Sequence, residues 1–171
     1  MDSNVKKEHW ENVFTTKQET EVSWFQPYPK TSIEFVKLFN LPFDANIIDI
    51  GGGDSHFVDA LLEEGYQNIW VLDISENALS RAKKRLGEKA NKVNWVVSDI
   101  IDFIPTVTYD FWHDRAAFHF LTTEENINKY VGIAEKGIKT NGILVLGTFS
   151  ETGPTKCSGL EIKQYSETSM S

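Results

Sequence analysis

The sequence has one cysteine, no long apolar run and fewer basic than acidic residues, and each of these shortages argues against a class of protein or partner. Cys157 is the only cysteine among 171 residues, so no disulfide can form within the chain, which fits a cytoplasmic location. No apolar run approaches the roughly 20 residues that a membrane-spanning helix needs, and the polar N-terminus is not a secretory signal. Basic residues are outnumbered, 17 against 25 acidic ones, giving a formal charge of -8. We therefore expect neither a membrane nor a nucleic acid as partner.

The remaining composition is that of a globular protein, 40% hydrophobic and 25% charged, over a length that fits one domain, 1–171. From residue 46 onward, short apolar segments alternate with helical ones. The strand candidates are 46–50, 69–74, 93–97, 109–113 and 143–149, and the helix candidates between them are 54–64, 75–86 and 123–139. Strands that are β-branched and apolar on both faces predict a Rossmann-like, doubly wound α/β fold with a mostly parallel sheet and helices on both faces.

The N-terminal region, residues 1–40, is expected to be helical and aromatic. Residues 5–17 predict a short helix with Trp10 and Phe14 on one side. A second helix is expected from Thr31 to about residue 40, because Thr31 and Glu34 have the spacing of a capping box.

The core that follows, 46–149, closes with a helix for which Thr122 and Glu125 predict another capping box. Residues 150–171 are expected to form a loop and the start of a helix capped by Ser166.

The most informative string is N-I-I-D-I-G-G-G-D-S, residues 46–55, followed by Asp73 at the end of the next strand candidate. Glycine lacks Cβ, so the backbone can turn sharply there and a ligand can approach it closely. A carboxylate at the end of the neighbouring strand can accept hydrogen bonds from two ribose hydroxyls. Together these features predict a nucleoside site at the carboxyl edge of a parallel sheet.

Four carboxylates stand at or just past the ends of successive strand candidates: Asp49, Asp73, Asp99 and Asp114. Phosphates suit this edge poorly. The third glycine of the dinucleotide fingerprint is replaced by His56, Asp54 adds negative charge, and the lysine-containing phosphate loop is absent. A nucleoside with a positive centre and an ammonium group fits better, and S-adenosyl-L-methionine has this makeup.

These strings resemble the motifs of class I S-adenosylmethionine-dependent methyltransferases over about residues 46–149. I-D-I-G-G-G at 48–53 looks like their first motif, V-L-D-I at 71–74 is similar to the second, and V-S-D-I at 97–100 resembles the adenine segment. The string Y-D-F-W-H-D-R at 109–115 sits where the fourth motif falls. The resemblance implies a methyltransferase that uses S-adenosyl-L-methionine.

The resemblance also implies roles for single residues. The methionine part of the cofactor would lie on the glycine run, the ribose on Asp73, and the adenine against Ile74, Ile100 and the Asp99 carboxylate. Trp24 would also touch the cofactor. The implied cofactor-binding set is Asp49, Gly51, Gly52, Gly53, Asp73, Ile74, Asp99, Ile100, His113 and Trp24.

Methyl transfer from a sulfonium requires mainly positioning and exclusion of water, so no catalytic triad need be visible. A base helps only where the acceptor must lose a proton, and Asp114 and His119 are the candidates. Two histidines without a third ligand do not predict a metal site.

The acceptor is a small molecule or a protein. The Asp-Arg pair at 114–115 looks like thiopurine and related thiol methyltransferases, and it partly matches a D-K-G-T string of some seven-strand protein lysine methyltransferases. The aromatic residues in 10–28 form either a lid over the cofactor or an anchor for the first helix. A nicotinamide-dependent oxidoreductase and a non-catalytic cofactor-binding module are the alternative functions.

Seven strands are usual in the resembled fold, and five are expected here. The last two strands are missing, which predicts a truncated C-terminus and an unpaired edge at 143–149. The chain is then a monomer, or a dimer through that edge.

Overall fold

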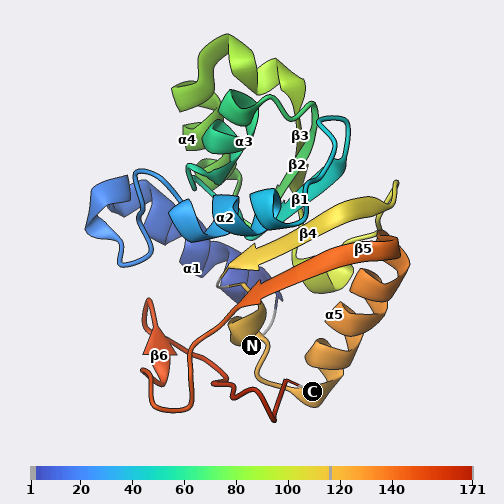
Figure 1. Ribbon diagram of the computed structural model, residues 1–171. Helices are drawn as coiled ribbons and strands as arrows, with labels where there is room; N and C mark the ends of the chain where they lie inside the picture. Colours follow the sequence, from blue (N-terminus) through green and yellow to red (C-terminus); the bar gives the residue numbers. More distant parts are fainter. Residues whose placement is uncertain (1–2, 116, 171) are drawn as a thin grey trace.

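The computed structural model describes residues 3–115 and 117–170 (Figure 1). Its centre is a five-stranded sheet in the order β3-β2-β1-β4-β5, and every pairing is parallel. The strands are β1 (Asn46–Ile50), β2 (Asn68–Asp73), β3 (Val93–Val97), β4 (Tyr109–Arg115) and β5 (Ile138–Gly147). The order reverses between β1 and β4, which is where an open parallel sheet forms its ligand crevice. The predicted Rossmann-like α/β fold is confirmed.

Helices cover both faces of the sheet (Figure 1). They are α1 (Ser3–Thr16), α2 (Lys30–Leu38), α3 (Phe57–Glu64), α4 (Glu76–Leu86) and α5 (Glu124–Gly137). The 3₁₀ segments are η1 (Glu19–Glu21), η2 (Gly87–Lys92), η3 (Ile100–Asp102) and η4 (Phe118–Phe120). A two-stranded hairpin, β6 (Lys156–Cys157) and β7 (Leu160–Glu161), follows the sheet.

Two hydrophobic cores result because successive residues of a strand point to opposite faces. Ile47 packs with α2, α3 and α4 in one core, whereas its neighbour Ile48 packs with α5 in the other. Both side chains are fully buried. Because helices cover both faces of the sheet, its strands are apolar on both faces, as is typical of parallel sheets.

Both predicted capping boxes in the core helices are wrong. Helix α2 begins at Lys30 after Pro29, so Thr31 lies inside the first turn and caps nothing. Helix α5 is capped one residue later than predicted, by Thr123, whose hydroxyl accepts from the Asn126 amide. Spacing alone does not identify the cap, because the cap is the residue whose backbone is still extended.

The bounds of other elements also differ from the predicted ones. Helix α3 starts at Phe57 rather than at residue 54, since the glycine loop continues through Ser55. Strand β5 starts at Ile138, earlier than predicted, beside a register irregularity between Tyr109 and Phe111. The chain from Ser166 to Met170 forms one turn, in which the Met170 amide donates to the Ser166 carbonyl and the Ser169 amide donates to the Ser166 hydroxyl, so Ser166 caps this turn as predicted.

Strand β5 forms an edge of the sheet, and Leu144 on it is 44% exposed. Just past its end, the Tyr165 amide donates to the Phe149 carbonyl at 2.9 Å, so the C-terminal segment lies against the continuation of this strand. Over residues 3–115 and 117–170, no helix is long and apolar enough to cross a membrane.

Candidate functional site

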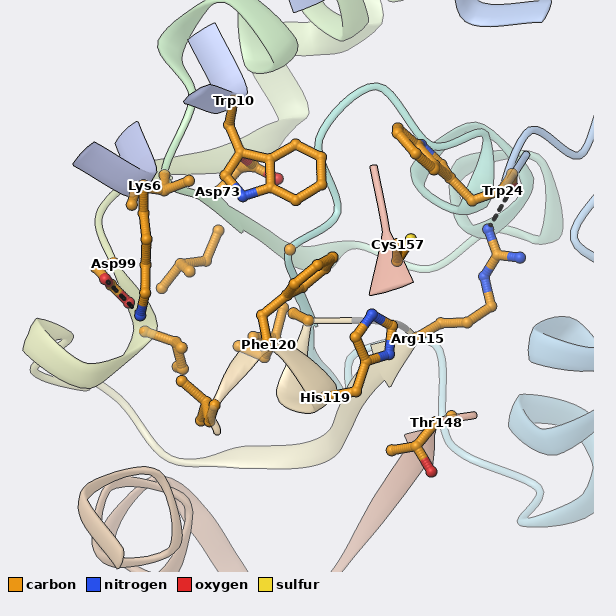
Figure 2. Close-up of a pocket in the computed structure, with 18 of the residues that line it drawn as sticks. Lys6, Trp10, Trp24, Asp73, Asp99, Arg115, His119, Phe120, Thr148 and Cys157 are labelled. Carbon is orange, nitrogen blue, oxygen red and sulfur yellow. Dashed lines mark hydrogen bonds and ion pairs between the residues drawn. The ribbon is translucent and has the colours of Figure 1, made fainter. Parts of the chain in front are cut away.

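A cavity of about 440 Å³ opens at the carboxyl ends of the parallel strands. Helix α1 contributes Trp10 and Phe14 to the lining. Figure 2 shows Trp10 on one side of the cavity and, on the other, His119 and Thr148 from the segments that follow β4 and β5. Seven of the predicted site residues line this cavity, coming from five separate segments of the chain. They are Trp24, Gly51, Asp73, Ile74, Asp99, Ile100 and His119.

Five predicted residues do not line the cavity and lie beneath or beside it. They are Asp49, Gly52, Gly53, His113 and Asp114. Their contacts show what each does in the fold.

The glycine loop is tightly packed. Gly51 has φ +64, and a Cβ there would come within 2.6 Å of the Ala117 Cβ. A Cβ on Gly52 would meet a carboxylate oxygen of Asp49 at 2.6 Å. No side chain fits at either position without displacing a neighbour, so the loop exposes bare backbone at the cavity floor.

Asp73, at the end of β2, is buried with a relative exposure of 6%. One carboxylate oxygen accepts from the Ser75 amide at 2.8 Å. Burial, together with the nearby carboxylates of Asp54 and Asp49, raises the pKa of Asp73 to about 7, against the opposing effect of its backbone hydrogen bonds. A carboxyl group held in this way favours a ligand that supplies hydrogen-bond donors or positive charge.

Asp99 is already engaged by α1. One oxygen accepts from the Ile101 amide at 3.3 Å, and the other accepts from the Ser3 hydroxyl at 3.1 Å and faces Lys6 Nζ at 3.8 Å (Figure 2). A carboxylate has about four lone-pair sites, so a further donor can still be accepted. The position of the N-terminal helix is thus tied to the predicted adenine end of the cavity.

The Asp49–His113 pair is internal. The Asp49 carboxylate lies 2.7 Å from His113 Nδ1, and His113 Nε2 lies 2.9 Å from the Ser32 hydroxyl. All three residues are less than 5% exposed, and the His113 ring packs on Phe57. None of the three lines the cavity, so this Ser-His-Asp order cannot act as a nucleophile relay there, and it instead links α2 to the strands under the glycine loop.

Asp114 is engaged by three internal hydrogen bonds. It accepts from the amides of Ala117 and Phe118 at 2.9 and 3.1 Å and from the Tyr130 hydroxyl at 2.9 Å. Burial raises its pKa to about 6. Because these bonds fix the turn that leads into η4, Asp114 positions His119 rather than facing the cavity itself.

His119 is fully buried, and its ring lies 4.4 Å from the Phe120 ring and 5.0 Å from the Phe149 ring, centroid to centroid. Neither ring nitrogen has a hydrogen-bond partner among the described residues. Burial lowers the pKa of His119 to about 4, so the imidazole is neutral at pH 7.

Several lining residues were missed from the sequence, among them Lys6, Arg115, Thr148 and Cys157. The hydrophobic side of the first helix, with Trp10 and Phe14, was the only signal for the α1 wall. Nothing in the sequence placed residues 148–157 beside the glycine loop. No group of three or more His, Cys, Asp or Glu residues within the described chain is arranged to hold a metal ion.

Comparison with known proteins agrees with this architecture. The chain is 28% identical over 107 residues to malonyl-[acyl-carrier protein] O-methyltransferase 2 of Ilyobacter polytropus, covering 62% of this chain and 40% of the relative. It is 28% identical over 109 residues to EEF1A lysine methyltransferase 2 of Mus musculus, covering 56% and 43%. The chain therefore spans about two-fifths of the length of these curated relatives.

Solved structures show the same fold. An S-adenosylmethionine-dependent methyltransferase from Clostridium acetobutylicum superposes with a TM-score of 0.63 at 18% identity, covering 87% of this chain and 58% of that one. Phosphoethanolamine N-methyltransferase 1 of Haemonchus contortus superposes with a TM-score of 0.69 at 15% identity, covering 91% and 35%. Residues 48–144 match the methyltransferase domain family. The chain belongs to this family, within the class I S-adenosylmethionine-dependent methyltransferase superfamily.

Proposed function

We propose that this chain binds S-adenosyl-L-methionine in the cavity and transfers its methyl group to an acceptor. The observation that carries the proposal is the convergence of the Gly51 backbone, the Asp73 carboxyl and the Asp99 carboxylate on one cavity. Family membership supports methyl transfer over the nicotinamide alternative.

The lining residues fit the parts of this cofactor. Asp73 has one carboxylate oxygen hydrogen-bonded to a backbone amide, and its remaining lone pairs suit the two ribose hydroxyls. Ile74 and Ile100 offer apolar surface for the adenine ring, with the Asp99 carboxylate beside them as acceptor for its amino group. The bare backbone at Gly51 leaves room for the methionine part.

The bound cofactor supplies an activated methyl group on a sulfonium. The chain's own residues then have to orient the acceptor and exclude water. Trp10, Phe14 and Trp24 line the cavity and pack on one another, with ring centroids 5.9–6.4 Å apart, as a shared aromatic cover over it. This packing supports the lid hypothesis for the aromatic residues of the N-terminal region.

Titration calorimetry with S-adenosylhomocysteine tests the binding step. We expect binding to the unmodified chain and a loss of about 1.5–3 kcal/mol in Asp73→Ala, because hydrogen bonds to a charged group are removed. Asp44→Ala, an exposed carboxylate outside the cavity, is the matched control and should bind normally. Unchanged affinity in Asp73→Ala would remove this residue from the site.

Transfer is tested separately with cofactor labelled on the methyl group. Incorporation of label into a small molecule or a protein is the expected result. Tight binding without transfer to any thiol, hydroxyl, amine or protein would instead identify a non-catalytic cofactor-binding module.

A further inference from the structure

The two ends of the cavity differ in chemistry. At the β2–β3 end stand the carboxyl groups of Asp73 and Asp99. At the β4–β5 end stand Arg115, His119 and Phe149. The sheet order β3-β2-β1-β4-β5 places the glycine loop, which follows β1, between these ends. If the nucleoside occupies the acidic end, the β4–β5 end lies beyond the methionine part and is open to the acceptor.

His119 is the most unusual group at this second end. A buried polar atom without a hydrogen bond is costly, and nearly all such atoms in folded proteins have a partner. Both His119 ring nitrogens lack one among the described residues, although the side chain is fully buried and lines the cavity. The neutral imidazole can donate from one nitrogen and accept at the other, so a polar group of a ligand would satisfy it.

His119 is also held rigidly. Its carbonyl accepts from the Lys163 amide at 2.8 Å, and the neighbouring Phe149 carbonyl accepts from the Tyr165 amide at 2.9 Å. Asp114 fixes the chain ahead of it through two amide hydrogen bonds. The imidazole is thus preorganised, and the two phenylalanines beside it, Phe120 and Phe149, also line the cavity and offer aromatic surface to a flat ligand.

Arg115 supplies the charge at this end. The other two arginines pair with carboxylates, Arg81 with Asp54 at 3.1 Å and Arg85 with Asp59 at 2.7 Å. Among the described residues, Arg115 has no carboxylate within 4.0 Å and donates only to the Trp24 carbonyl, at 3.1 Å (Figure 2). In a chain of formal charge -8, an arginine at a cavity wall without a counter-charge suits an anionic ligand group.

We propose that the β4–β5 end is the acceptor site, and that it takes a small aromatic molecule with a carboxylate for Arg115 and a protic nucleophile for His119. This inference rests on the proposed methyl transfer. The nucleophile's lone pair forms the new bond to carbon, the carbon–sulfur electron pair stays on sulfur, and the nucleophile's proton passes to the imidazole and then to water.

The experiment uses three probes that share one shape, 4-aminobenzoate, 4-hydroxybenzoate and 4-mercaptobenzoate, and the corresponding neutral benzamides. Binding to the chain saturated with S-adenosylhomocysteine is measured by calorimetry, without turnover. We expect the benzoates to bind at least tenfold more tightly than their benzamides. Arg115→Met should abolish this difference, and Arg115→Lys, which keeps the charge, should retain part of it.

His119→Phe keeps a flat ring and removes both nitrogens. We expect methyl transfer to the best benzoate to fall at least tenfold, while the melting temperature rises because an unsatisfied buried polar group is removed. If both methyl transfer and the melting temperature fell in this variant, the role of His119 would be purely structural.

Three results would overturn the inference while leaving the cofactor proposal intact. One is binding of S-adenosylhomocysteine without binding of any benzoate, and another is equal affinity for benzoates and benzamides. The third is an Arg115→Met variant that loses affinity for S-adenosylhomocysteine but not for 5′-methylthioadenosine, which lacks the amino-acid group. That outcome would assign Arg115 to the cofactor carboxylate. Failure of S-adenosylhomocysteine to bind at all would instead refute the proposed function.

Discussion

At the scale of single residues, the ionised carboxylate of Asp73 destabilises the folded state. Its carboxyl is buried beside the carboxylates of Asp49 and Asp54, and its pKa is raised to about 7. A raised carboxyl pKa means that the folded state holds the proton more tightly than the unfolded state. Stability from this group is therefore fully present below about pH 4 and is lost as the pH rises through about 7. A ligand with hydroxyl donors at this carboxylate would offset part of that loss.

Asp73→Asn tests this linkage. The amide cannot ionise, so the variant should gain stability relative to the unmodified chain as the pH rises from 4 to 8. The rise of the Asp73 pKa from its ordinary value of 3.8 to about 7 corresponds to at most about 4 kcal/mol of unfolding free energy. Urea denaturation at several pH values measures it, and a stability difference that does not change with pH would contradict the raised pKa.

The Trp112–Tyr130–Asp114 chain makes a second prediction for a single residue. Trp112 Nε1 donates to the Tyr130 hydroxyl at 3.0 Å, and that hydroxyl donates to Asp114. Tyr130→Phe leaves a buried donor and an acceptor unpaired and should cost about 1–3 kcal/mol of unfolding free energy. Tyr109→Phe is the matched control, since this hydroxyl is buried on the same strand as Trp112 without a partner among the described residues. An equal loss in both variants would argue against the chain of hydrogen bonds.

At the scale of elements, the C-terminal half of α1 is joined to α4 by polar contacts. The Glu11 carboxylate accepts from the Ser75 hydroxyl and from the amides of Glu76 and Asn77 at 2.8–3.1 Å, at the N-terminus of α4. Arg81 donates to the Phe14 carbonyl at the end of α1. An anion at a helix N-terminus is a favourable arrangement, so α4 anchors α1 over the cavity.

Glu11→Ala should loosen α1. Loss of these hydrogen bonds is expected to cost about 1–3 kcal/mol and to weaken S-adenosylhomocysteine binding several-fold, because Trp10 and Phe14 line the cavity. Limited trypsin digestion should become faster at Lys6 and Lys17. Glu8→Ala, an exposed carboxylate on the same helix, is the control. Similar digestion rates in the two variants would show that Glu11 does not hold the helix.

At the scale of the whole molecule, the cavity draws on α1, the ends of all five strands or the loops that follow them, and the β6 residue Cys157. A ligand bound there would contact α1 together with residues at or just past the ends of all five strands. Binding should therefore stabilise the molecule as one unit rather than a local loop.

S-adenosylhomocysteine at 100 times its dissociation constant should add about 2.7 kcal/mol to the unfolding free energy. For a chain of this size the melting temperature should rise by roughly 5–10 °C. Differential scanning fluorimetry measures the shift, with NADH as the control ligand. A shift with NADH and none with S-adenosylhomocysteine would favour the nicotinamide alternative.

Local patterns predicted the sheet well. The bounds of β1 and β3 match the predicted strands. Short runs of β-branched and apolar residues between turns are by themselves typical of buried strands. The carboxyl edge as the site of the ligand followed from parallel topology, since the ends of such strands must meet. Helix caps were less predictable, because Thr31 lies inside α2 and Thr122 lies one residue before the cap of α5, although both have the spacing of a capping box.

The sequence alone determined the superfamily, the parallel sheet and the carboxyl-edge location of the glycine loop with Asp73 and Asp99, because these depend on neighbours along the chain. Only the tertiary structure decided that Asp49, His113 and Asp114 turn inward while Arg115 and His119 face the cavity. Of these residues, His113, Asp114, Arg115 and His119 lie within seven positions of one another. The directions of their side chains depend on Ser32, Tyr130 and Phe149, which are distant in sequence. Contacts of that kind form only when the segments pack, and no local pattern encodes them.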